Sequence, residues 1–130
     1  MVKGPRSFRA DERGSASVEL VVLMPLLLLI LFSGVQGAVY YHASTLALAA
    51  AQEGARAAAR ENATLAAGTS AATAFVTDTA GDSLSSVAIT GSRTAVTVTI
   101  TVRGSSLSLV PGWTPTVERS ASLPVERITR

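Results

Sequence analysis

A single carboxylate stands at the start of the longest apolar segment of this chain. Glu19 follows the small-residue stretch Gly14–Val18 and precedes an almost entirely apolar run from Leu20 to Tyr41. A charged side chain within a lipid layer costs about 3 kcal/mol on insertion scales, so it is expected to have a partner or a function. Cleavage between Gly14 and Ser15 would create such a partner. The new α-ammonium group of Ser15 would lie one helical turn from Glu19, on the same chain or on a neighbouring one.

Size and composition limit the classes of protein that remain. The 130 residues provide for one small domain and a membrane anchor. Cysteine is absent, which excludes a disulfide framework and thiolate metal sites. The net charge is only +2, and the eleven basic residues are scattered among nine acidic ones. This distribution argues against nucleic acid as a partner, because no basic face is formed.

The sequence contains no recognisable set of catalytic or ligand residues. His42 is the only histidine, and the carboxylates that follow the apolar run show no paired spacing. A metal site needs several ligands, and a phosphate site needs a glycine-rich loop; neither pattern is present. We therefore expect a protein that is not an enzyme and that uses no cofactor, metal or small-molecule substrate.

The apolar run is long enough to cross a membrane. It contains 22 residues from Leu20 to Tyr41, and at about 1.5 Å per residue these span a hydrocarbon core of roughly 30 Å. Basic residues precede the run, whereas residues 40–52 contain neither lysine nor arginine. The positive-inside rule therefore predicts a cytoplasmic N-terminus, an extracytoplasmic C-terminal part and the lipid bilayer as a partner. Tyr40 and Tyr41 would lie at the outer headgroup level or, equally well, against the soluble domain.

Three glycines and a proline mark special positions in the predicted long helix. Pro25 lacks a backbone donor and crowds the preceding turn, which predicts a bend between Val21 and Pro25. Gly34 and Gly37 would let another helix approach closely, although glycine is also common in membrane helices without such a role. Gly54 is a weak point in a segment otherwise rich in helix formers, and we assign it, too, to helix packing.

Residues 43–62 consist mainly of strong helix formers, so one helix is predicted to continue from the membrane segment, from about Ser17 to Arg60. Glu53 lies three residues before Arg56, which predicts an exposed ion pair. The alanine-rich face of this segment carries too little bulk to build a core alone, which favours packing against partner chains.

The C-terminal part shows a short helix followed by strands. A loop is predicted around residues 62–68, and residues 69–79 after it have helical periodicity. The alternation from Val96 to Val102 predicts a half-buried strand, preceded by a strand at Val87–Ile89 and joined to it by a turn at Gly91-Ser92. Residues 116–125 supply a third, edge strand that ends near Pro124. Trp113 is expected in the core or at its rim. The predicted fold class is thus α+β: a long N-terminal helix, a short helix and a small antiparallel sheet of about three strands.

Two stretches of the sequence resemble the TadE-like family of tight-adherence (Flp, type IVc) pili. These are Arg13–Leu20 with the proline-containing apolar segment after it, and Ala49–Ala58; together they cover about residues 13 to 60. The resemblance implies a pilin-like fold and a minor pilin-like membrane protein, or pseudopilin, needed for assembly of the fibre. It implies that Gly14 is the last leader residue, Ser15 the new N-terminus and Glu19 the acid on which recognition and assembly depend. The implied partners are a prepilin peptidase, other pilins and minor pilins of the same system, and the inner-membrane assembly platform.

These observations predict four segments. Residues 1–14 are a cytoplasmic leader, 15–41 a transmembrane helix, 42–62 its extracytoplasmic continuation and 63–130 a small α+β extracytoplasmic domain. The protein is expected in the cytoplasmic membrane, as a single-pass protein, or in the pilus. Two other interpretations stay open: an uncleaved, membrane-anchored binding protein, and a secreted protein released after Gly37. The acid at position 19 argues against the second, because a signal peptide has no use for it.

Overall fold

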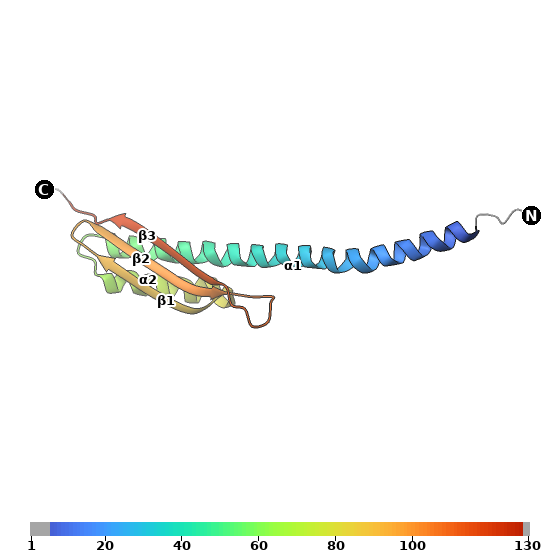
Figure 1. The fold of residues 1–130 in the computed structure, drawn as a ribbon. Helices are drawn as coiled ribbons and strands as arrows, with labels where there is room; N and C mark the ends of the chain where they lie inside the picture. Colours follow the sequence, from blue (N-terminus) through green and yellow to red (C-terminus); the bar gives the residue numbers. More distant parts are fainter. Residues whose placement is uncertain (1–5, 129–130) are drawn as a thin grey trace, which may run out of the picture. The chain divides into compact units, whose positions relative to one another are not determined.

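The computed structural model describes residues 6–128, with side chains from Gly14 to Ile128. These residues form two helices, two single helical turns and three strands (Figure 1): α1 Arg6–Ala59, α2 Leu65–Phe75, a π-helical turn Val76–Ala80, a 3₁₀ turn Gly81–Ser83, β1 Leu84–Arg93, β2 Thr97–Ser106 and β3 Thr116–Pro124. This order of elements confirms the predicted α+β fold class. The chain divides into two compact units between Val35 and Gln36, so α1 contributes to both.

Helix α1 begins earlier than predicted. The backbone is helical from Arg6 rather than from about Ser17, because the arginine, alanine and glutamate residues that precede Gly14 are themselves good helix formers. Pro25 lies inside the helix, which continues on both sides of it. At the other end, α1 stops at Ala59, and Asn62 adopts a positive φ of 62° in the reversal that follows.

Helix α2 lies four residues closer to the N-terminus than the predicted helix 69–79. Its start is set by Thr64, whose hydroxyl accepts a hydrogen bond from the N–H of Ala67 at 3.1 Å and so forms an N-cap. Gly68, which the sequence interpretation placed in a loop, is part of this helix. Glycine weakens a helix, but a side chain at Gly68 would collide with Ala58 of α1, so the packing of the two helices requires glycine here.

The three strands form an antiparallel sheet in the order β1-β2-β3. On the central strand, Val98, Ile100 and Val102 are completely buried, and Ile100 pairs with Gly91 on one side and Ala121 on the other. The opposite face carries hydroxyl groups paired across β2 and β3: Thr99 with Ser122 and Thr101 with Ser120, each at 2.8 Å. The predicted alternation is therefore confirmed for β2, with an apolar inner face and a polar outer face.

The predicted turn at Gly91-Ser92 is wrong. Both residues belong to β1, and the β1–β2 turn lies at Thr94–Val96, where the hydroxyl of Thr94 accepts hydrogen bonds from the N–H groups of Val96 at 3.3 Å and Thr97 at 3.0 Å. Gly91 has a packing role instead. A Cβ at this position would lie 2.8 Å from Cδ1 of Ile100 and 2.9 Å from Cδ1 of Leu65.

The two edges of the sheet are irregular. On β1, the pairing register shifts between Ser85 and Ala88, and Ser86 has a positive φ of 50°. On the other edge, β3 ends at Pro124, which has no backbone N–H to offer. Regular pairing is thus interrupted near one end of each edge strand.

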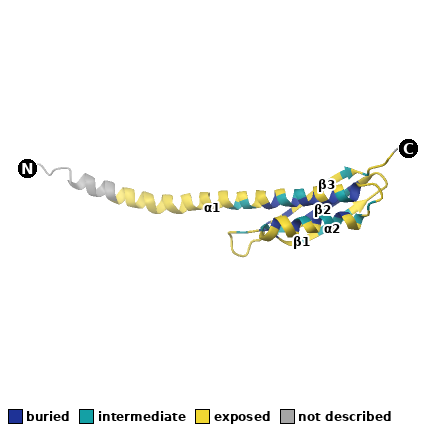
Figure 2. Ribbon diagram, turned by 180° about the vertical axis from the view of Figure 1, so that it is seen from behind, coloured by how far each residue is buried: buried dark blue, intermediate teal, exposed yellow. Residues whose placement is uncertain are grey.

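The alanine-rich face of α1 is covered by the chain itself, which corrects the expectation that it needs partner chains. Six alanines of this face are completely buried in the same core cluster as the valines and Ile100 of β2: Ala43, Ala47, Ala50, Ala51, Ala55 and Ala58. Small side chains let α1 approach the sheet and α2 closely, so the bulk is supplied by the β-branched residues of the sheet. Figure 2 shows the buried part of α1 beside the sheet.

Candidate membrane anchor and assembly segment

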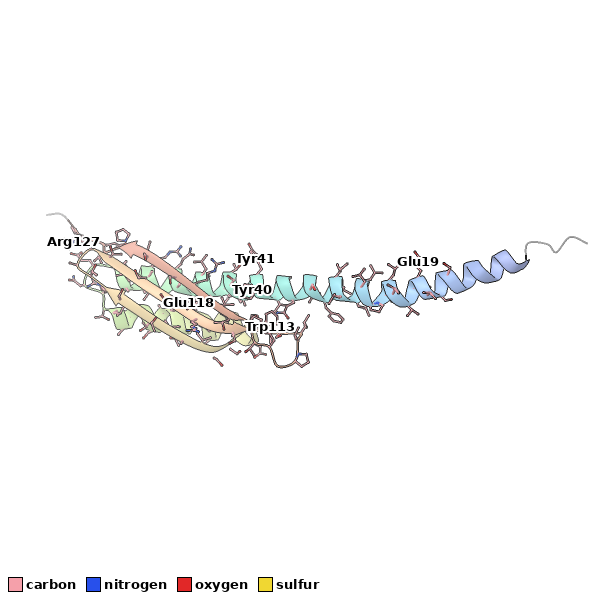
Figure 3. The ribbon with its side chains drawn as sticks, in the orientation of Figure 1. Glu19, Tyr40, Tyr41, Trp113, Glu118 and Arg127 are labelled. Carbon is pink, nitrogen blue, oxygen red and sulfur yellow. The ribbon has the colours of Figure 1, made fainter. Side chains whose placement is uncertain are left out.

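The predicted processing and assembly residues lie together on α1. Gly14, Ser15 and Glu19 are all exposed (Figure 3 labels Glu19), and a Cβ added to Gly14 would meet nothing within 4 Å. Ser15 and Glu19 are four residues apart in a helix, so they lie on the same face. A chain that began at Ser15 would therefore place its terminal ammonium group within reach of the Glu19 carboxylate. The carboxylate would also lie near the positive end of the helix dipole, which stabilises a negative charge.

The apolar side chains that follow Glu19 are uncovered. The large apolar residues from Val18 to Val35 retain between 39% and 71% of their accessible surface. Within the described part of the chain, one helix is long and apolar enough to cross a membrane, and it includes this segment. A helix that is apolar on all sides is stable only when lipid or other helices surround it. The segment is therefore a candidate membrane anchor.

The predicted packing glycines fall into two groups. A Cβ at Gly34 or Gly37 would meet no atom within 4 Å, so neither residue is required by contacts within the chain. Gly54, in contrast, lies against α2: its Cβ would be 2.8 Å from the carbonyl oxygen of Gly68 and 3.0 Å from Cβ of Ala72. Its close contact is within the folded unit, while Gly34 and Gly37 leave open surface for another molecule.

Polar side chains within the apolar run have partners in the chain. The hydroxyl of Ser33 donates to the carbonyl of Leu29 at 2.7 Å, one helical turn earlier. Gln36 uses both ends of its amide on the loop between β2 and β3: Nε2 donates to the carbonyl of Leu107 at 3.1 Å, and Oε1 accepts from the N–H of Leu109 at 2.7 Å. This role of Gln36 was not predicted from the sequence. A lone amide in an apolar helix indicates such a role, because its polar atoms need hydrogen-bond partners.

The two tyrosines differ in their contacts with the folded unit. Tyr40 is 41% exposed, and its hydroxyl donates to the carbonyl of Thr116 at 3.3 Å, so it packs against the folded unit. Tyr41 is 73% exposed and points away from it (Figure 3). Ser44, a few residues after Tyr41 on α1, is buried, and its hydroxyl accepts a hydrogen bond from Nε of Arg119 at 2.7 Å. The side chains of Gln36, Tyr40 and Ser44 thus join the middle of α1 to the β2–β3 loop and strand β3.

The described residues provide little for catalysis. No group of three or more histidine, cysteine, aspartate or glutamate side chains is placed to hold a metal among residues 14–128, and His42 is exposed. A cavity of about 400 Å³ between α2, the π-helical turn and β1 is lined by residues without ionisable groups: Thr69, Thr73, Val76, Thr77, Val87 and Ile89. Glu53 and Arg56 form the expected exposed ion pair at 3.8 Å. Such pairs contribute little to stability.

Comparison with family models found that the model described as TadE-like protein matches residues 14–56. The match agrees with the resemblance seen in the sequence, and it covers less than half of the chain. The matched residues include Gly14, Glu19 and most of the buried alanine face, and they end before α2 and the sheet. No curated protein and no solved structure matched the chain.

Proposed function

We propose that this chain is a minor pilin-like subunit, a pseudopilin, that acts in the assembly or initiation of a tight-adherence type IV pilus. The observation that carries the proposal is the contrast along α1. From Val18 to Val35 its large apolar side chains are exposed, whereas from Gln36 the helix is part of a folded unit with its own core. The TadE-like match covers this same helix. Such a helix fits a subunit whose first half is surrounded by lipid before assembly and by neighbouring helices afterwards.

The proposed membrane arrangement follows the charge asymmetry of the sequence. Residues 1–14 form the cytoplasmic leader, 15–41 span the cytoplasmic membrane, and 42–130 lie on the extracytoplasmic side. A prepilin peptidase acts at the cytoplasmic surface and hydrolyses the bond between Gly14 and Ser15. The product then has an ammonium group four residues before Glu19.

In this mechanism Glu19 sets the axial position of the subunit. In the membrane the carboxylate pairs with the Ser15 ammonium of its own chain. On assembly it pairs instead with the Ser15 ammonium of a neighbouring chain. A pair of this kind contributes more to specificity than to stability, because desolvation offsets much of the attraction. The other pilins of the system and the inner-membrane assembly platform are the partners, and Gly34 and Gly37 are the points of closest helix approach.

The folded unit argues against release after Gly37. Cleavage there would remove Gln36, whose amide holds the backbone of Leu107 and Leu109. An uncleaved, membrane-anchored binding protein would keep these contacts, so N-terminal processing is what distinguishes it from a pseudopilin.

N-terminal sequencing of the membrane-bound protein, with and without the host's prepilin peptidase, tests the proposal. We expect a chain that starts at Ser15 when the peptidase is present and at the original N-terminus when it is absent. A chain that keeps residues 1–14 in both strains, or that starts at Ala38, would contradict the pseudopilin function.

A further inference from the structure

The loop between β2 and β3 exposes a group of large apolar side chains. We call residues 107–115 the apolar loop. Its members Leu107, Leu109, Val110 and Trp113 keep between 47% and 54% of their surface exposed. Of the two places expected for Trp113, the core or its rim, this exposure excludes the core. The sequence has no charged residue between Arg103 and Glu118. Exposed apolar groups gathered in one loop mark an interaction surface.

The apolar loop has a defined conformation. Pro111 and Gly112 occupy the centre of a turn that is closed by a hydrogen bond from the N–H of Trp113 to the carbonyl of Val110 at 3.3 Å, and Gly112 has a positive φ of 78°. This is the residue pattern of a type II turn. At the base, the N–H of Ser106 donates to the carbonyl of Pro115 at 3.0 Å. The apolar side chains are therefore presented by a closed loop.

The position of the loop along α1 indicates what covers it. Gln36 holds the loop by two hydrogen bonds, and Tyr40 holds the start of β3 just beyond it. Both residues lie in the last turns of the apolar run that ends at Tyr41. In the proposed membrane arrangement these turns reach the outer headgroup region, so the loop lies at the same level as the lipid surface. Figure 3 shows Trp113 and Tyr40 in the same region of the folded unit.

We propose that the apolar loop inserts its leucine, valine and tryptophan side chains into the outer leaflet of the cytoplasmic membrane. The inference rests on the proposed membrane anchoring and adds a second point of attachment. Tryptophan is suited to the boundary between headgroups and acyl chains, because its ring is apolar and its N–H can still reach water or a headgroup. A loop without charges carries no penalty for transfer of ions into this layer. Two attachments would fix the orientation of the sheet relative to the membrane.

Trp113 is the only tryptophan in the chain, so its fluorescence reports on the loop directly. The experiment uses the full chain reconstituted in phosphatidylcholine–phosphatidylglycerol vesicles. Bromine atoms are placed on the lipid acyl chains either near the headgroup or near the terminal methyl group. We expect emission at short wavelength, strong loss of emission with the shallow bromines, weaker loss with the deep ones, and protection from aqueous acrylamide. Emission that acrylamide removes and neither bromolipid affects would overturn the inference.

A separate measurement distinguishes failure of this inference from failure of the proposed anchoring. Resistance to alkaline extraction shows whether the chain is inserted. An inserted chain with Trp113 in water overturns the apolar loop inference and leaves the anchoring intact. A chain that alkali extracts overturns both.

Paired variants test whether the loop side chains are responsible. Leu109→Ser combined with Val110→Ser is expected to weaken quenching by the shallow bromines and to increase quenching by acrylamide. The control is Val96→Ser, a change of another exposed valine, in the β1–β2 turn at the opposite end of β2. It is expected to leave both signals unchanged. Equal effects from the two changes would contradict the proposal.

A second copy of the chain is the other possible cover for the loop. Dilution of the protein in lipid separates the two cases. With lipid as the occupant, bromolipid quenching is independent of the protein-to-lipid ratio. Protection from acrylamide that is lost on dilution, without quenching by bromolipid at any ratio, would assign the loop to a protein interface and overturn the inference.

Discussion

At the scale of single residues, the proposed function depends on Glu19. We expect Glu19→Gln to leave membrane insertion intact and to abolish incorporation into fibres, because a neutral amide cannot neutralise the Ser15 ammonium of a neighbour. Alkaline extraction measures the first outcome, and detection of the subunit in sheared pili the second. Glu53→Gln is the matched control, since Glu53 is an exposed acid paired only with Arg56 at 3.8 Å. Assembly of the Glu19 variant at the normal level would contradict this role.

Gly14 is the second residue on which the proposed function depends. A leucine at this position is expected to prevent removal of the leader, because the peptidase then has to accept a bulky side chain beside the bond that it cuts. The full-length mass of the membrane-bound protein reports the result. Gly37→Leu, which also places leucine where a side chain has open space, should be processed normally. Equal processing of both variants would remove the support for cleavage after Gly14.

At the scale of elements, the contact between α1 and α2 requires two glycines. A Cβ on Gly68 would lie 2.5 Å from Cβ of Ala58, and one on Gly54 would lie 2.8 Å from the carbonyl of Gly68. Each alanine substitution is expected to destabilise the folded unit by about 1–3 kcal/mol, the usual cost of overpacking. Thermal unfolding in detergent, followed by circular dichroism, measures the loss. Gly37→Ala is expected to cause no loss, because it adds a methyl group in open space and favours the helix.

The link between α1 and the apolar loop gives a second prediction at this scale. Gln36→Leu keeps the apolar run intact and removes two hydrogen bonds, each worth about 1 kcal/mol. We expect faster hydrogen exchange at the amide of Leu109, which donates to Gln36 at 2.7 Å, with little change in the sheet. Gln52→Leu, at an exposed position on the same helix, serves as the control. Unchanged exchange at Leu109 would show that the loop is held by other contacts.

The sequence predicted those elements that local patterns determine. The apolar run, the helix formers after it and the alternation of β2 each specify one element without reference to the rest of the chain. Two of the errors concern glycines. Gly91 and Gly68 were interpreted as turn and loop residues, whereas both are small because Ile100, Leu65 or Ala58 approaches them from another element. Such contacts join residues that are far apart in the sequence, so a local sequence pattern gives no information about them.

For the candidate site, too, the sequence indicates some residues and not others. Glu19 and the glycines of the anchor stand out because a charge or a gap in an apolar run is visible in the sequence. The apolar loop did not stand out, because a Pro-Gly turn beside a tryptophan is as typical of a core rim as of an exposed surface. Its position depends on Gln36, which lies 73 residues from Leu109.

At the scale of the whole molecule, residues 36–130 form a compact unit with their own core. We expect a fragment of these residues to unfold in one cooperative transition, since α1 from Ala43 onward supplies the buried alanines that the sheet needs. A fragment that begins at Arg60 is the control and is expected to remain unfolded, because the inner face of β2 would be exposed. Thermal denaturation of the two fragments measures the difference. Cooperative unfolding of the shorter fragment would show that α1 is dispensable for the core.

The irregular edges of the sheet restrict how copies of this subunit can join. The register shift between Ser85 and Ala88 on one edge and Pro124 on the other interrupt the rows of backbone groups that a foreign strand would need. Sideways extension of the sheet from one copy into the next, as in amyloid, is therefore hindered at one end of each border. Under the proposed function, we expect polymers that include this subunit to elongate through their helical stems rather than through their sheets.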